Sequence, residues 1–284
     1  MTSTVSRPRK FETTGKATIY LALTLLAVGT LFPFIWALGT SFKTEKQAIA
    51  MPPQWIPDPI RLQNYIDAWN MFPFGRFYYN TLLFAVLGML GSIALSSLAG
   101  YALAKYQFRG QYAILIFIIA TMMIPYWVNL VPVYTILAKL GWLDTYHGLI
   151  IPRLARPFGI FLMRQYIRSI PSDYIDAARI DGASEFGIFW RIILPQCTPV
   201  LATLAIFFFV EDWNSFMWPL VVTNSLEMRT VTVGLALLSG SPHRTEYALQ
   251  MAAATIGALP AIAVFLAFQR YLTQGITLSG LKGQ

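Results

Sequence analysis

Tyr174–Pro195 reads YIDAARIDGASEFGIFWRIILP, and this stretch differs in character from the sequence around it. The chain of 284 residues is 56% apolar and only 12% charged, yet this stretch carries Asp176, Arg179, Asp181 and Glu185 close together. A soluble core could not hide so much apolar surface in a chain with about half the usual share of charges. We therefore interpret the chain as an integral membrane protein whose apolar segments are interrupted by one polar loop.

Apolar segments long enough to cross a membrane occur six times. A hydrocarbon core of about 30 Å takes about 20 helical residues, and these runs are too long and continuous for the alternating strands of a membrane barrel. The sequence predicts an all-α polytopic membrane protein, with a tail at 1–16 and a single transmembrane domain at 17–284. The six transmembrane helices are expected at roughly 17–40, 78–104, 111–133, 145–163, 197–222 and 248–270.

The positions of the basic residues predict the orientation. With the N-terminus placed in the cytoplasm, 12 of the 21 lysines and arginines fall in cytoplasmic segments, seven fall in outer segments and two fall within 145–163. Lysine and arginine are enriched in cytoplasmic loops. Both termini are therefore expected inside, and residues 164–196 become the longest cytoplasmic loop.

Helix start and stop signals divide this loop in two. Ser172 can cap a helix, and Asp173 and Asp176 would lie in its first turn, where the helix dipole favours anions. Gly182 suits a helix stop, and Ser184 suits a second start. The loop is predicted to form two short helices that meet at Gly182.

Small side chains in the loop suggest a contact with another protein. Ala177, Ala178 and Ala183 would let a second backbone approach closely, and the charges between them keep the segment in water. Two interpretations remain open on these grounds. One is a helix that docks into the cleft of a partner, and the other is a solvated loop helix without a partner.

The residues of this loop resemble the EAA loop of ABC-transporter permease subunits, whose pattern is E-A-A, a glycine four residues later, and then I-x-L-P. Stretches elsewhere, including FPFIWALGTSFK (32–43), YALAKYQFRG (101–110) and DWNSFMWPLV (212–221), resemble the carbohydrate-uptake branch of that family. The chain departs from the pattern at Asp176, where the family usually has Glu. The resemblance assigns the ATPase-coupling loop to Asp176, Ala177, Ala178, Asp181, Gly182, Leu194 and Pro195.

The resemblance implies an import permease in the prokaryotic cytoplasmic (inner) membrane. Its partners would be a homologous second permease subunit, two ATP-binding subunits, an extracytoplasmic substrate-binding protein and membrane lipid. ATP and magnesium would bind to the partner ATPase. The substrate would be a sugar, an oligosaccharide or a polyol derivative.

Other chemistries lack sequence support. The chain has no G-x-x-x-x-G-K-[ST] phosphate loop, and His147 and His243 are too far apart in sequence to suggest a zinc site. We expect no catalytic residue, metal or cofactor in this chain, and we attribute its net charge of +8 to cytoplasmic loops rather than to nucleic-acid binding. A secondary transporter, for which we find no clear internal repeat, and a non-transporting scaffold that recruits a cytoplasmic partner remain the alternatives.

Two acids lie within the fifth predicted span. An acid at mid-membrane costs about 2.5–3.5 kcal/mol on insertion scales, so Glu211 and Asp212 should face protein or water. Asn214 and Ser215 follow one turn later and would extend a polar strip along the helix. These four residues either line the translocation path or, for the acids, only neutralise buried cations.

Two arginines supply such cations. Arg153 and Arg156 lie about 8–11 residues from the outer end of the fourth predicted span, a depth similar to that of Glu211 and Asp212 from theirs. Three residues apart, the arginines would share one helix face. We hypothesise an ion pair between one arginine and one acid that joins the two spans.

Overall fold

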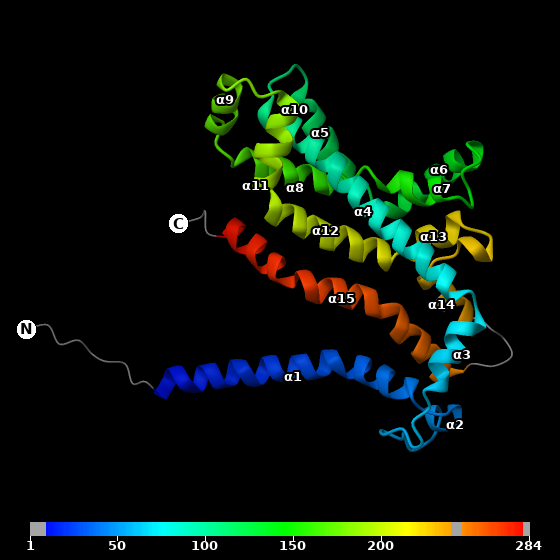
Figure 1. Ribbon diagram of the computed structural model, residues 1–284. Helices are drawn as coiled ribbons and strands as arrows, with labels where there is room; N and C mark the ends of the chain where they lie inside the picture. The colour runs from blue at the N-terminus through cyan, green and yellow to red at the C-terminus, as the bar shows by residue number, and fades with distance from the viewer. Residues whose placement is uncertain (1–9, 240–245, 281–284) are drawn as a thin grey trace, which may run out of the picture. The chain divides into compact units, whose positions relative to one another are not determined.

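The computed structural model describes residues 10–239 and 246–280, and these residues form helices and connecting loops without a strand (Figure 1). The expected all-α class is thus confirmed for the described part of the chain. The elements are α1 (Lys10–Ser41), α2 (Glu45–Ala48), α3 (Gln63–Met71), α4 (Phe74–Lys105), α5 (Gln111–Met122), α6 (Tyr126–Lys139), α7 (Tyr146–Ile150), η1 (Ile151–Arg153), α8 (Pro157–Arg168), α9 (Asp173–Ile180), α10 (Glu185–Ile188), η2 (Phe189–Ile193), α11 (Leu194–Gln196), α12 (Thr198–Trp213), α13 (Met217–Val222), η3 (Leu226–Met228), α14 (Val231–Ser239) and α15 (Tyr247–Gly280).

Among the described residues, three helices are long and apolar enough to cross a membrane: Gly15–Ser41, Phe74–Lys105 and Tyr247–Gln269. Two further pairs of helices qualify if each bent pair counts as one span. The first pair, α5 and α6, is bent by 101°, and the second, Glu185–Gln196 with α12, by 78°. The structure therefore supports three to five spans, and the count of six stays a prediction.

Residues 145–163 do not form the single helix expected of a span. They comprise α7, η1, an extended break at Arg156 and the first half of α8. Pro152 and Pro157 explain the break, because proline removes a backbone donor and disfavours the helical conformation of the preceding residue. At the other end of the chain, α1 already begins at Lys10, so part of the predicted tail is helical; residues 1–9 lie outside the described residues.

The described residues divide into two compact units, one within residues 1–68 and 242–256 and the other within 69–241 and 257–284. In the second unit α4 lies alongside both α8 and α12 (Figure 1). Gly100 on α4 makes the close approach to α8 possible, since an added Cβ would lie 2.9 Å from the backbone nitrogen of Arg164. Small residues serve the same purpose wherever membrane helices pack closely.

An apolar core lies between α4, α8 and the helices that follow Gly182. Met163, Ile167, Ile188, Ile193 and Leu204 are fully buried in it. These residues come from α8, α10, η2 and α12, so the polar loop is anchored through one face of its helices. The loop is consequently packed against the core of the second unit.

The first unit joins the end of α1 to α3 and to the start of α15. The buried amide of Asn64 donates hydrogen bonds of 2.8 Å to the carbonyl oxygens of Ser41 and Lys43. The Glu45 carboxylate accepts from the backbone N–H groups of Tyr247 and Ala248, at 2.9 and 3.1 Å. An anion at this point is favourable because the first turn of a helix presents free N–H groups.

Candidate functional site

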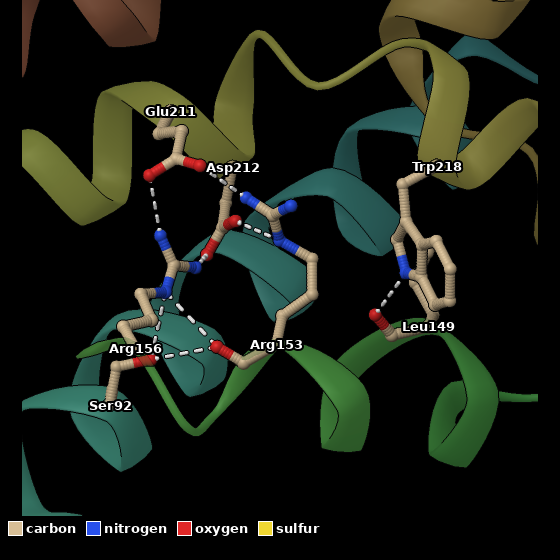
Figure 2. A network of polar contacts seen from close by, with 7 residues as sticks. All are labelled: Ser92, Leu149, Arg153, Arg156, Glu211, Asp212 and Trp218. Carbon is tan, nitrogen blue, oxygen red and sulfur yellow. Dashed lines mark hydrogen bonds and ion pairs between the residues drawn. The ribbon is translucent and has the colours of Figure 1, made fainter. Parts of the chain in front are cut away.

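Four charged side chains meet where two helical segments end. Arg153 ends η1 and Arg156 directly precedes α8, while Glu211 and Asp212 lie in the last turn of α12 (Figure 2). Arg153 donates to Glu211 Oε1 at 2.7 Å and to Asp212 Oδ1 at 3.0 Å. Arg156 donates to Glu211 Oε2 at 2.8 Å and also to Asp212 Oδ2. Each arginine therefore bridges both acids, and the hypothesised pairing is present as a network of four charges.

The broken backbone between Pro152 and Pro157 places the two arginines differently from the expected shared helix face. Arg156 has extended backbone angles, φ −109° and ψ 107°. Its guanidinium Nε lies 3.0 Å from the carbonyl oxygen of Arg153 and 3.0 Å from Ser92 Oγ on α4. The expectation of a common helix face is wrong, because the break turns the guanidiniums toward α12 from two separate elements.

Burial is unequal within the network. The side chain of Asp212 is 0% exposed, those of Arg153 and Arg156 are 12% and 9% exposed, and that of Glu211 is 58% exposed. A buried charge needs its partners far more than an exposed one does. The network is therefore centred on Asp212 and its two guanidiniums, and Glu211 closes it at the accessible side.

A cavity of about 580 Å³ lies beside this network. Its wall combines the two guanidiniums and Glu211 with aromatic and apolar side chains. The lining residues are Thr121, Met122, Ile124, Tyr126, Asn129, Leu130, Val133, Pro152, Arg153, Ala155, Arg156, Pro157, Phe158, Phe208, Glu211 and Trp218. The cavity can accept a ligand with hydroxyl groups on one side and an apolar face on the other.

The four candidates for the translocation path fall in different places. Glu211 lines the cavity and Asp212 lies buried behind it. The helix ends at Trp213, so Asn214 and Ser215 lie in the break before α13. The expected polar strip along one helix is therefore wrong, because it required α12 to continue for another turn.

Sequence reasoning missed three neighbours of the arginines. Ser92 Oγ accepts from Arg156 and also donates to the Arg153 carbonyl at 3.1 Å. The Arg156 guanidinium lies 4.5 Å from the ring centre of Phe208, and that of Arg153 lies 5.8 Å from the ring centre of Tyr126. Ser92 carried a usable signal, since a polar residue in the middle of an apolar span tends to face the protein interior.

The polar loop forms α9 and α10, separated by a turn at Gly182. Gly182 has φ +79°, and the backbone N–H groups of Gly182 and Ala183 donate to the carbonyls of Arg179 and Ala178, at 3.0 and 2.9 Å. This is the Schellman pattern, in which a left-handed glycine ends a helix. Ser184 caps α10 by accepting from the Gly187 N–H.

The expected cap at Ser172 is wrong. Ser172 has helical backbone angles and its side chain makes no capping hydrogen bond. Its Oγ lies instead 3.4 Å from the ammonium of Lys105, which also donates to the Ile170 carbonyl. Asp173 and Asp176 do occupy the first turn of α9, as expected.

A polar clamp joins α9, α10 and the end of α4. Arg179 donates to Glu185 at 2.7 and 3.2 Å, and the Tyr106 hydroxyl lies 2.5 Å from the same carboxylate. The hydrogen bond from Arg179, followed by that from Tyr106, lowers the pKa of the Glu185 carboxyl below its usual value. Burial, and then the hydrogen bond to Glu185, raises the pKa of the Tyr106 hydroxyl. The clamp therefore favours an ionised Glu185 and a protonated Tyr106.

The exposed face of α9 differs from the one expected. Ala178 is only 7% exposed and packs in the core, whereas Ala177 faces outward. The assignment of Ala178 to a docking face is therefore corrected, because one turn of helix cannot present both alanines to the same side. The outward face is formed by Tyr174, Asp176, Ala177, Ile180, Asp181 and Gly182.

The end of the loop motif lies in α11. Leu194 is half-buried against the core and Pro195 is exposed. The backbone runs without interruption from α10 through η2 to Gln196 and then bends into α12. A displacement of α9 and α10 would thus reach α12 directly.

Comparison with known proteins places these features in a family. Residues 92–278 match the family described as the binding-protein-dependent transport system inner membrane component. The arabinooligosaccharides transport system permease protein AraQ of Bacillus subtilis (strain 168) is 34% identical over 270 residues, which cover 93% of this chain and 96% of AraQ. The trehalose/maltose transport system permease protein MalG of Thermococcus litoralis is 32% identical over 278 residues, which cover 96% and 99% of the two chains.

A solved structure shows a similar fold over nearly the whole chain. It is the crystal structure of a bacterial ABC transporter involved in the import of the acidic polysaccharide alginate. The similarity has a TM-score of 0.85 at 25% identity and covers 94% of this chain and 99% of that one. The helical arrangement described above is therefore shared with a chain of an ABC importer.

Proposed function

The chain belongs to the family of binding-protein-dependent transport system inner membrane components, and from this membership we propose that it forms part of the path by which a bacterial importer moves a carbohydrate across the inner membrane. The protein is a permease subunit of an ABC importer, a transport component rather than an enzyme. The observation that carries the proposed substrate class is similarity to sugar and oligosaccharide permeases along almost the entire chain.

The cavity supports an uncharged substrate within that class. Two guanidiniums are balanced by two carboxylates at hydrogen-bond distance, Glu211 in the cavity wall and Asp212 buried behind it, so the network as a whole carries no net formal charge. An anionic substrate would need a cation that is not already paired, because removing charges from water is costly without compensation. A neutral sugar or polyol instead needs donors, acceptors and aromatic surface, which Glu211, Asn129 and Tyr126 offer.

Uptake by the assembled transporter tests this proposal. The chain would be reconstituted in liposomes with a second homologous permease, two ATP-binding subunits that bind ATP and magnesium, and the extracytoplasmic binding protein. We expect uptake of a neutral oligosaccharide that requires ATP and the binding protein. Uptake driven by an ion gradient without ATP would favour a secondary transporter, and absence of transport under every condition would favour the scaffold.

We assign α9 and the turn at Gly182 the role of transmitting movement of the ATPase to the membrane helices. This role is supported by the outward face at Ala177 and by the continuous backbone into α12. An added side chain at Gly182 would meet no atom within 4 Å, so a substitution there tests the backbone conformation alone. Gly182→Val should uncouple ATP hydrolysis from uptake, because a β-branched residue is unfavourable at positive φ.

Gly182→Asn is the matched control, because asparagine tolerates the left-handed conformation. It should retain more of the uptake per ATP hydrolysed than the valine variant. The assay measures uptake and hydrolysis in the same liposomes. Equal coupling in both variants would remove the support for this role of the turn.

The proposed orientation places both termini and α9 in the cytoplasm. It rests on the distribution of lysine and arginine between the two sides. Gln63 at the start of α3 and Ala183 between α9 and α10 are both exposed, and they are expected on opposite sides of the membrane. In sealed cells, a membrane-impermeant thiol reagent should label Gln63→Cys but not Ala183→Cys, and the reverse pattern would invert the topology.

A further inference from the structure

The segment between α2 and α3 carries an unusual number of exposed apolar side chains. We call residues 49–62 the Trp55 loop. Met51 is 89% exposed and Ile56 is 80% exposed. An apolar patch of this kind normally marks a surface that is covered in the working protein. Its large apolar side chains are Ile49, Met51, Trp55, Ile56, Ile60 and Leu62.

The Trp55 loop folds back along the end of α1. The Trp55 ring lies 6.1 Å from the Phe32 ring and meets the Trp36 ring edge-on at 5.1 Å. The ammonium of Lys43 lies 4.1 Å from the Trp36 ring centre, and this lysine is 1% exposed. Trp36 precedes the helix end at Ser41 by five residues, or about 7.5 Å of rise. The loop thus reaches down the side of α1 instead of extending away from it.

The helix on which the loop lies is itself an uncovered span. Residues Gly15–Ser41 are apolar, and residues 15–35 are exposed throughout, whereas Thr40 and Ser41 at the helix end are buried. Its 27 residues correspond to about 40 Å, whereas the hydrocarbon core takes about 20 residues. About seven residues therefore extend beyond the core, and the two tryptophans mark the C-terminal end of α1 as one that suits the headgroup region, where tryptophan and tyrosine are enriched. Trp36 and Trp55, whose rings are in contact, have the composition of such an interface.

The backbone of the loop is also suited to an environment that is poor in water. Four of the ten residues 51–60 are prolines: Pro52, Pro53, Pro57 and Pro59. Proline has no backbone N–H, and each unpaired N–H that leaves water carries a free-energy cost. A non-helical segment with this composition can enter the membrane interface at a lower cost than an ordinary loop.

We propose that the Trp55 loop inserts into the headgroup–acyl boundary of the lipid bilayer at the C-terminal end of α1 and anchors that end of the helix. Continuity with the uncovered span favours lipid as the occupant, because the same exposed apolar surface runs from α1 onto the loop. Insertion of about 5–10 Å is typical of interfacial segments. The loop would anchor this end of α1 in the same way on either side of the membrane.

Spin-label accessibility tests the proposal in the assembled transporter in lipid nanodiscs. A nitroxide would be attached at Met51→Cys or at Ile56→Cys in a Cys197→Ala background, which removes the buried native thiol. Gln63→Cys, on the exposed surface of α3 in the same unit, is the matched control. Collisions with dissolved oxygen report apolar surroundings, and collisions with a water-soluble nickel chelate report water.

We expect the ratio of oxygen to nickel accessibility to be several-fold higher at positions 51 and 56 than at position 63. High nickel accessibility at 51 and 56 would overturn the proposal, because the loop would then lie in water. Low accessibility to both reagents would overturn it as well, since a protein partner would then cover the loop. Both substituted side chains are exposed, so the labels should leave the fold intact.

Discussion

Removing the charge of Asp212 should destabilise the protein far more than removing that of its neighbour Glu211. Both carboxylates contact both arginines, yet Asp212 is 0% exposed and Glu211 is 58% exposed. Asp212→Asn leaves two guanidiniums, 12% and 9% exposed, without their buried counter-charge. Breaking a buried pair by removing one partner costs about 3–5 kcal/mol. Glu211→Gln removes an exposed partner, for which the usual cost is below about 1 kcal/mol.

Thermal unfolding of the purified transporter measures this difference. The loss of the folded chain with temperature would be followed by size-exclusion chromatography, and midpoints would be compared at a single heating rate because unfolding of such proteins is commonly irreversible. Asp212→Asn should lower the midpoint strongly, and Glu211→Gln should change it little. Equal midpoints, or a larger effect at Glu211, would refute the argument from burial.

A charge-reversal cycle tests the pairing itself. Arg156→Glu places a third negative charge beside Glu211 and Asp212 and should impair assembly. Combining it with Glu211→Arg restores opposite charges across the same 2.8 Å contact and should recover part of the loss. Non-additivity is the signature of a direct interaction, so a double variant no better than the sum of its parts would contradict the contact.

Three further outcomes follow from the packing and from the clamp. Gly100→Ala should lower the unfolding midpoint, because its Cβ would lie 2.9 Å from the facing backbone of α8. The control Gly29→Ala meets no atom within 4 Å and should gain about 1 kcal/mol of helix propensity. Equal shifts of the midpoint in the two variants would contradict the close approach. Ala177→Glu should uncouple uptake from ATP hydrolysis while keeping the unfolding midpoint, whereas Ala178→Glu should lower the midpoint by burying a charge; the reverse pattern would show that the outward face is misassigned. The hydrogen bond from Arg179 lowers the pKa of Glu185 below its usual 4.5. The stability that this carboxylate contributes is therefore present above pH 4.5 and is lost as the pH falls through the lowered pKa. Loss of hydrogen-exchange protection in residues 183–188 well above pH 4.5 would contradict the clamp.

The loop illustrates what local sequence determines. Gly182 and Ser184 were sufficient to predict a left-handed helix stop and a following cap, since both depend on the residue's own backbone and on neighbours within a few positions. Ser172 also precedes a predicted helix and could have capped it, but the Lys105 ammonium from α4 lies beside its hydroxyl. That contact depends on a residue far away in sequence, so local rules could not anticipate it.

The charged network shows the same division. Counting residues from the outer end of each predicted span placed Arg153 and Arg156 at the same membrane depth as Glu211 and Asp212. Pairing was then expected, because an ionised side chain in apolar surroundings needs an opposite charge. The helical spans assumed in that count proved broken. Only the tertiary structure showed that the prolines turn both guanidiniums toward α12 and that Ser92 accepts a hydrogen bond from Arg156.

Composition and hydropathy by themselves determined that the chain is an all-helical membrane protein with a polar loop, because both properties are sums over residues and independent of packing. Which face of each helix is covered was decided by the tertiary structure. Ala177 and Ala178 are identical in chemistry and adjacent in sequence, yet α9 turns one outward and the other into the core. Ala178 shares the core with Ile175, three residues earlier on the same face of α9, and that packing leaves Ala177 outside.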